Sequence, residues 1–150
     1  MRNTIVFLLI CVALVCGQIS PGQRQAILDY QLTLPRANQL ITAMEAMTKY
    51  VVSLPDFQNR IRKSMTMTPA ERLAQIENDP KAMAIVKQNG LTARDYLVGV
   101  PTLRMALLAA QGGPLAASVI ASPANVAFVR EHLVELKMKM NAAEGIPSRK

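Results

Sequence analysis

The chain has 150 residues, a formal net charge of +7 and an apolar fraction of 51%. This length is that of one domain, and this apolar fraction excludes an intrinsically disordered chain. Aromatic residues make up only 4% and Trp is absent, so the core must be aliphatic. A single His and two Cys exclude a metal site built from several His and Cys ligands.

The first 17 residues are typical of an export signal. Arg2 precedes an unbroken apolar run from Ile5 to Val15, which is shorter than the roughly 20 residues of a membrane-spanning helix. The small Gly17 at its end suits a signal peptidase. We therefore predict a signal peptide over 1–17 and a mature domain over 18–150 that is periplasmic or extracellular. An uncleaved membrane anchor is the alternative.

Both cysteines, Cys11 and Cys16, lie in this signal. The mature domain is therefore expected to contain no disulfide and to depend on its apolar core. A lipoprotein with Cys16 lipidated is a further alternative, but the large Val15 before it argues against lipidation.

Helix signals run through the remaining chain, and neither strand alternation nor a hairpin signal is seen. We expect a loose N-terminus over 18–22, a connector with a helical turn over 112–122 and a basic tail over 145–150. The predicted helices cover 23–31, 36–53, 56–63, 69–78, 80–89, 93–111 and 123–142.

Several of these helices have clear start and stop signals. A cap residue followed by Pro predicts helix starts at Thr68–Pro69, Asp79–Pro80 and Ser122–Pro123. Capping boxes are predicted where the cap residue is followed three positions later by an acid, in Thr68–Glu71 and Thr92–Asp95. Stops are predicted at Gly90, Gly112–Gly113 and Gly145.

Apolar residues recur at intervals of three and four in the three longest predicted helices. The stripes are Leu40, Met44, Met47, Val51 and Leu54; Leu97, Val100, Leu103, Leu107 and Ala110; and Val126, Val129, Leu133, Leu136 and Met140. We predict an all-α fold, a compact bundle of three longer helices and several short ones without a sheet. Pro101 should kink or break its helix, and we interpret Gly99–Pro101 as a packing adjustment rather than a hinge.

The chemistry that enzymes need is not visible. Gly112–Gly113 lacks the lysine of a phosphate-binding loop, and the single His132 is interpreted as a surface histidine. The acids show no general acid–base pair, and several are explained as helix caps. We predict a non-enzymatic protein with no catalytic, cofactor-binding or metal-binding residues and no cofactor.

The charge distribution bears on partners. The densest basic cluster is Arg60, Arg62 and Lys63, and the next is Lys137, Lys139, Arg149 and Lys150. An exported basic domain suggests contact with an anionic envelope surface or with another protein, and the alternative is simply a solvated surface. Nucleic acid is not expected, because aromatic residues are not interleaved with these cations. No transmembrane segment is expected in the mature chain.

Two further residue types stand out. Arg104 lies in the most apolar stretch of the mature chain, so we expect a structural ion pair or a stem that reaches water. Methionine occurs nine times, with Met-x-Met pairs at Met65–Met67 and Met138–Met140. These residues could bind Cu(I), but methionine also fills gaps in a core that lacks aromatics, and we prefer that interpretation.

Two resemblances follow from short phrases. Asn78–Pro80, Gly90–Tyr96 and Ser122–Phe128 together resemble a group of small exported bacterial proteins of unassigned function, which implies an all-α exported domain. Met67–Glu71 and Leu91–Asp95 resemble the LTxxQ motif of the Spy-like periplasmic chaperones, although neither ends in Gln. We therefore predict a binding or structural role in the cell envelope, with a holdase-like chaperone and a methionine-based Cu(I)-binding protein as alternatives.

Overall fold

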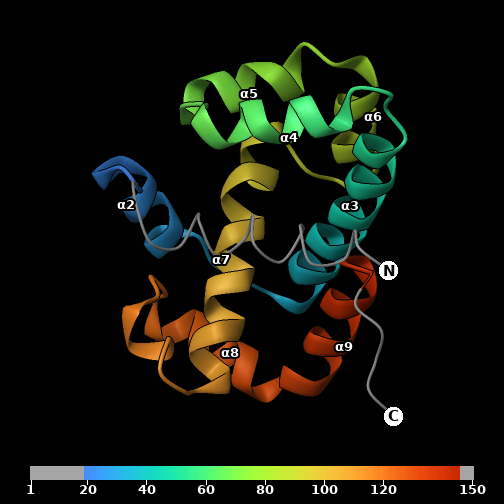
Figure 1. Cartoon of the computed structure of the whole chain (residues 1–150). Coiled ribbons are helices and arrows are strands. Elements are labelled where there is room, and N and C mark those ends of the chain that lie inside the picture. The colour runs from blue at the N-terminus through green and yellow to red at the C-terminus, as the bar shows by residue number, and fades with distance from the viewer. Residues whose placement is uncertain (1–18, 146–150) are drawn as a thin grey trace.

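The computed structural model describes residues 19–145, and within that range it contains helices and no strand. The all-α prediction is confirmed for these residues (Figure 1). The predicted signal segment with both cysteines, and the basic residues Arg149 and Lys150, lie outside the described residues. The helices are α2 (Pro21–Asp29), α3 (Leu34–Val52), α4 (Phe57–Thr66), α5 (Pro69–Glu77), α6 (Pro80–Gln88), α7 (Ala93–Gln111), the 3-10 turn η1 (Ala116–Ser118), α8 (Pro123–Glu131) and α9 (Leu133–Ala143).

Helix α7 is the axis of the fold. It runs through the middle of the molecule and packs against α2, α3, α5, α6, α8 and α9 (Figure 1). Helices α4 and α5 lie across one end of α7, and α8 lies at the other. Within the described range no helix combines the length and hydrophobicity that crossing a lipid bilayer requires.

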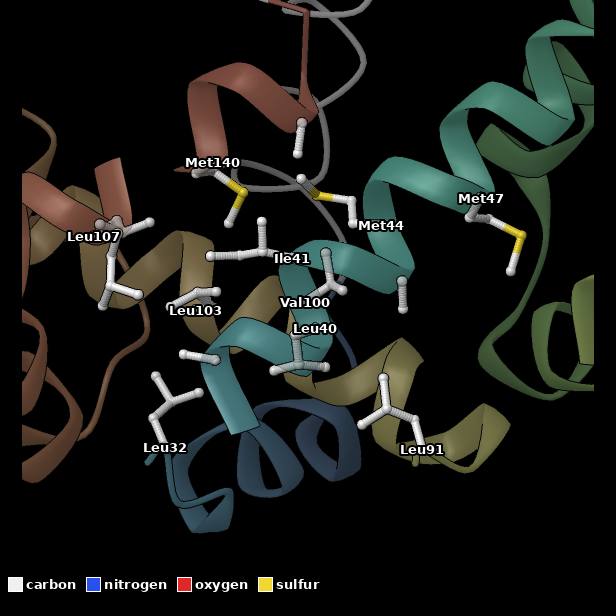
Figure 2. Close-up of a cluster of buried hydrophobic side chains, with 14 of the residues drawn as sticks. Leu32, Leu40, Ile41, Met44, Met47, Leu91, Val100, Leu103, Leu107 and Met140 are labelled. Atoms are coloured by element: carbon white, nitrogen blue, oxygen red, sulfur yellow. The ribbon is translucent and has the colours of Figure 1, made fainter. Parts of the chain in front are cut away.

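The core is aliphatic, as the composition predicts. Its largest fully buried apolar side chains come from five different helices: Leu40, Leu103, Leu136, Val86 and Val129. Figure 2 shows side chains of α3, α7 and α9 gathered in this cluster. Burying a residue of this size stabilises the fold by roughly 1.5–3 kcal/mol.

The helix ends follow local sequence closely. The capping boxes at Thr68 and Thr92 are both present, and Asp79 and Ser122 cap their helices as predicted. Gly90 has a φ of 69°, which only glycine adopts without strain, and it ends the α6 segment.

The first two helices begin earlier than predicted, at 21 and 34 rather than 23 and 36. Ser20 forms a capping box with Gln23, and Thr33 accepts a hydrogen bond from the backbone of Arg36. The expected loose N-terminus is therefore wrong at Pro21 and Gly22, which are helical. The cap-and-proline signal used for the later helices is also present at Ser20–Pro21, and applying it there would have given the observed start, since Pro is favoured in the first turn of a helix. Similarly, α4 continues to Thr66, three residues beyond its predicted end.

Helix α7 continues through Pro101 from Ala93 to Gln111, so the expected break does not occur. The Thr102 hydroxyl donates a hydrogen bond to the Val98 carbonyl at 2.7 Å, four residues back. Gly99 is in close contact with Leu40 of α3, and a Cβ atom there would lie 2.7 Å from Leu40 Cδ2. The packing interpretation of Gly99 therefore agrees with the structure.

The predicted helix over 123–142 is wrong in one respect, because it is two helices that meet at His132. His132 has φ −115° and ψ 17°, outside the helical region, although neither Pro nor Gly is nearby. Helix α8 packs on α7, whereas α9 packs chiefly on α3. The change of direction at His132 therefore coincides with a change of packing partner, from α7 for α8 to chiefly α3 for α9.

A buried asparagine of α8 bonds to the segment between α2 and α3. The side-chain oxygen of Asn125 accepts a hydrogen bond from the Leu32 backbone N–H at 2.9 Å, and its amide donates to the Tyr30 carbonyl at 2.7 Å. These bonds hold the link between α2 and α3 on α8. Because Asn125 is only 3% exposed, they satisfy backbone groups that water reaches poorly.

Candidate functional site

A cleft of about 740 Å³ lies between α3, α4, α5, α7 and α9. Most of its wall is aliphatic or methionine side chain. The apolar members are Met47, Val51, Leu54, Ile61, Met65, Ile76, Ala82, Leu97, Val100, Pro101, Met105, Leu107, Leu108, Leu115, Val119 and Met140. Ligand pockets in proteins occupy roughly 300–1,000 Å³ and are mostly apolar with a few placed polar groups. The size and lining of this cleft fall within that description.

Helix α4 forms one wall and is poorly packed. It buries no residue, and it makes none of the main helix–helix contacts within residues 19–145. Its cleft-facing side contributes Ile61, Ser64 and Met65, and Met65 is 54% exposed. An amphipathic helix gains stability by covering its apolar side, and α4 covers little of it.

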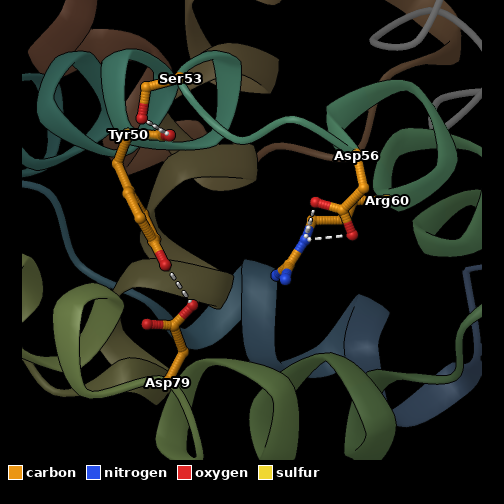
Figure 3. A network of polar contacts seen from close by, with 5 residues as sticks. All are labelled: Tyr50, Ser53, Asp56, Arg60 and Asp79. Carbon is orange, nitrogen blue, oxygen red and sulfur yellow. Dashed lines mark hydrogen bonds and ion pairs between the residues drawn. The ribbon is translucent and has the colours of Figure 1, made fainter.

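A polar contact links the N-terminus of α4 to its first turns. The Asp56 carboxylate accepts hydrogen bonds from Arg60 Nε at 3.0 and 3.1 Å (Figure 3). Asp56 stands at the N-terminus of α4 but makes no capping hydrogen bond to its backbone. The Arg60 guanidinium, which lines the cleft, is thus already paired.

A second polar contact joins α3 to the start of α6 at the edge of the cleft. The Tyr50 hydroxyl donates to Asp79 Oδ2 at 2.7 Å (Figure 3), and the Lys81 ammonium lies 4.9 Å from the centre of the Tyr50 ring. Partial burial opposes ionisation of Asp79. Hydrogen bonds from Tyr50 and from the backbone of Ala82 and Lys81 outweigh it and hold the pKa of Asp79 below its ordinary value.

The ion pair expected for Arg104 is present. Its Nη2 lies 2.9 Å from Glu144 Oε1, across α7 and α9, and 3.2 Å from the sulfur of Met44. Arg104 and Glu144 both line the cleft. Tyr96 of α7 also lines the cleft, and burial raises the pKa of its phenol to about 12.

Arg72 is the lining residue that sequence reasoning missed. It lies on α5 beside Gln75 and Ile76, and its Nε atom is shielded from solvent and has no hydrogen-bond partner in the described part of the chain. A signal for it existed, because Arg72 precedes Ile76 by one helical turn and so shares the apolar face of α5. That is the same reasoning that singles out Arg104.

The other residues discussed from the sequence are dispersed. Met44, Met47 and Met140 are buried, as the packing interpretation predicts, whereas Met138 is 59% exposed. His132 lies at the junction of α8 and α9, its ring 5.0 Å from that of Phe128. Among the described residues, His, Cys, Asp and Glu nowhere form a group of three that could hold a metal ion.

The basic clusters lie at the margin of the cleft rather than on one face of it. Arg60 and Lys137 line it, whereas Arg62 and Lys63 are exposed on α4 outside the lining. Lys139 is held by Glu135 at 2.6 Å and by Asn38. Of these basic residues in the described part of the chain, only Arg60 and Lys137 could therefore face a ligand in the cleft.

Comparison of the chain with protein-family models, with curated proteins and with solved structures gave no match. The geometry of the cleft is therefore the basis for the function proposed next.

Proposed function

We propose that this is an exported, non-enzymatic binding protein of the cell envelope that holds an apolar small molecule in the cleft. The observation that carries the proposal is the cleft of about 740 Å³ with its largely apolar wall. Export and the envelope are expectations from the N-terminal sequence. Among the binding and structural roles that the sequence leaves open, the cleft favours binding.

The packing of α4 supports this role. An apolar ligand between α4 and α7 would cover Ile61, Met65 and Leu108, which the protein itself leaves half-buried or exposed. Leu115, which follows α7, is 54% exposed and lines the same cleft. Covering such surface lowers the free energy by roughly 25 cal/mol for each Å² removed from water, so the ligand would also stabilise the fold.

The proposal is tested with a neutral apolar fluorophore, N-phenyl-1-naphthylamine, titrated into the purified protein. We expect saturable binding of one molecule per chain, with increased fluorescence and a raised melting temperature. Placing a charge on the wall with Met65→Glu should weaken binding by about ten-fold, because the carboxylate would lose water when the ligand enters.

Met138→Glu is the matched control. Met138 is an exposed methionine on a helix, like Met65, but it does not line the cleft. We expect its affinity for the fluorophore to equal that of the unmodified protein. Binding that does not saturate, or equal affinities in both variants, would overturn the proposal.

A further inference from the structure

Most charged side chains on the cleft wall have a polar partner or contact solvent, but Arg72 differs from them. Arg60 is paired with Asp56, Arg104 with Glu144, and Asp79 accepts the hydrogen bond from Tyr50. Lys137 is exposed to solvent. Arg72 is half-buried, and within residues 19–145 no carboxylate lies within ion-pair distance of its guanidinium.

The lack of a partner for Arg72 matters because part of its guanidinium is shielded from water. Within residues 19–145 its Nε–H is shielded from solvent and has no acceptor, and the same holds for Nε of Arg104, which also lines the cleft. A buried donor of a charged group without an acceptor is costly, so an acceptor brought by a ligand would be stabilised there. A guanidinium donates two parallel hydrogen bonds to a carboxylate or phosphate. The acceptor expected at Arg72 is therefore one of these two anionic groups.

We infer that the cleft binds a single-chain amphiphile with an anionic head group, the head on the Arg72 guanidinium and the chain along the apolar walls. This inference rests on the proposed function and specifies the class of ligand. The apolar wall accounts for the chain, and Arg72 accounts for the charge of the head. The net charge of +7 of the whole chain adds a general attraction for anions.

The experiment compares four ligands that share a dodecyl chain, titrated calorimetrically below the concentrations at which they aggregate. The ligands are dodecanoate, dodecyl phosphate, dodecanol and dodecyltrimethylammonium. We expect at least one anion to bind about ten-fold or more tightly than dodecanol, and the cation to bind most weakly, since a charge-assisted hydrogen bond contributes about that factor. The comparison of the two anions shows which head group fits.

Arg72→Gln keeps a polar side chain but removes the positive charge. It should lower the affinity for the preferred anion by about ten-fold and leave that for dodecanol unchanged. Arg72→Lys, which keeps the charge without the planar fork, should fall between. Arg62→Gln is the matched control, because Arg62 is exposed on α4 outside the cleft lining. Melting temperatures establish that each variant is folded.

The outcomes separate the two proposals. If dodecanol binds as tightly as both anions, or if Arg72→Gln and Arg72→Lys weaken anion and alcohol equally, the inference about the head group is wrong while binding in the cleft stands. If neither the dodecyl compounds nor the neutral fluorophore binds, the proposed function itself is wrong.

Discussion

Replacing Gly99 by Ala tests the close packing of α3 on α7. A Cβ atom at residue 99 would lie 2.7 and 2.8 Å from the two δ-carbons of Leu40 and 2.8 Å from the Tyr30 hydroxyl. Carbon atoms pack best at roughly 3.5–4.0 Å, so the overlap is close to 1 Å on three atoms. Leu40 is completely buried and lies against the core on its other side, so it cannot turn away without displacing neighbours.

Two opposing terms decide the magnitude. Ala stabilises a helix interior by about 1 kcal/mol relative to Gly, whereas overpacking of a core costs about 1–3 kcal/mol and more when backbone must shift. With three contacts this short, overpacking prevails, and we expect a net destabilisation of about 2 kcal/mol. The melting temperature should fall by roughly 4–8 °C for a chain of this size.

Urea unfolding followed by far-ultraviolet circular dichroism measures this effect. Gly22→Ala is the matched control, since Gly22 is also helical but a Cβ there meets nothing within 4 Å. We expect that variant to be unchanged or slightly stabilised. In a double-mutant cycle, Leu40→Ala should remove most of the cost of Gly99→Ala. If Gly99→Ala stabilises the protein as Gly22→Ala does, the close approach of the two helices is incorrect.

Three further expectations concern polar contacts. Thr68→Ala should lower the free energy of unfolding by about 1 kcal/mol, because it removes a capping box, and Thr68→Asp should be tolerated. If Thr68 belonged to a chaperone motif, Thr68→Ala would instead reduce protection of client proteins without reducing stability. Aggregation assays and melting temperatures of both variants distinguish these outcomes. Asp79→Asn should cost about 1 kcal/mol at pH 7. Because the folded pKa of Asp79 lies below its ordinary 3.8, that difference should shrink as the pH falls below about 4 and vanish below the folded pKa, measured by urea unfolding across this range. Asn125→Ala should cost about 2–4 kcal/mol by leaving two buried backbone groups unpaired, and thermal unfolding that shows no change would contradict their burial.

Local sequence predicts much of the secondary structure. Thr68, Asp79 and Thr92 cap helices because each cap depends on residues only two or three positions away. The stripe from Leu40 to Met47 is buried because its spacing places these residues on one side of a helix, whatever that helix then contacts. Capping and periodicity are short-range properties, so a single sequence contains them.

Tertiary structure decides the rest. The break at His132 has neither Pro nor Gly to signal it, and it separates α8, which packs on α7, from α9, which packs chiefly on α3. Spacing places Arg72 on the apolar face of α5, but the fold is what brings α5, α7 and α9 together around the cleft. Arg104 is already paired to Glu144 there, so Arg72 becomes the candidate ligand contact. The cleft itself is a space between five helices, and the volume left between packed elements depends on their distances and angles. Those quantities depend on contacts between residues far apart in the chain, which neither spacing nor composition specifies.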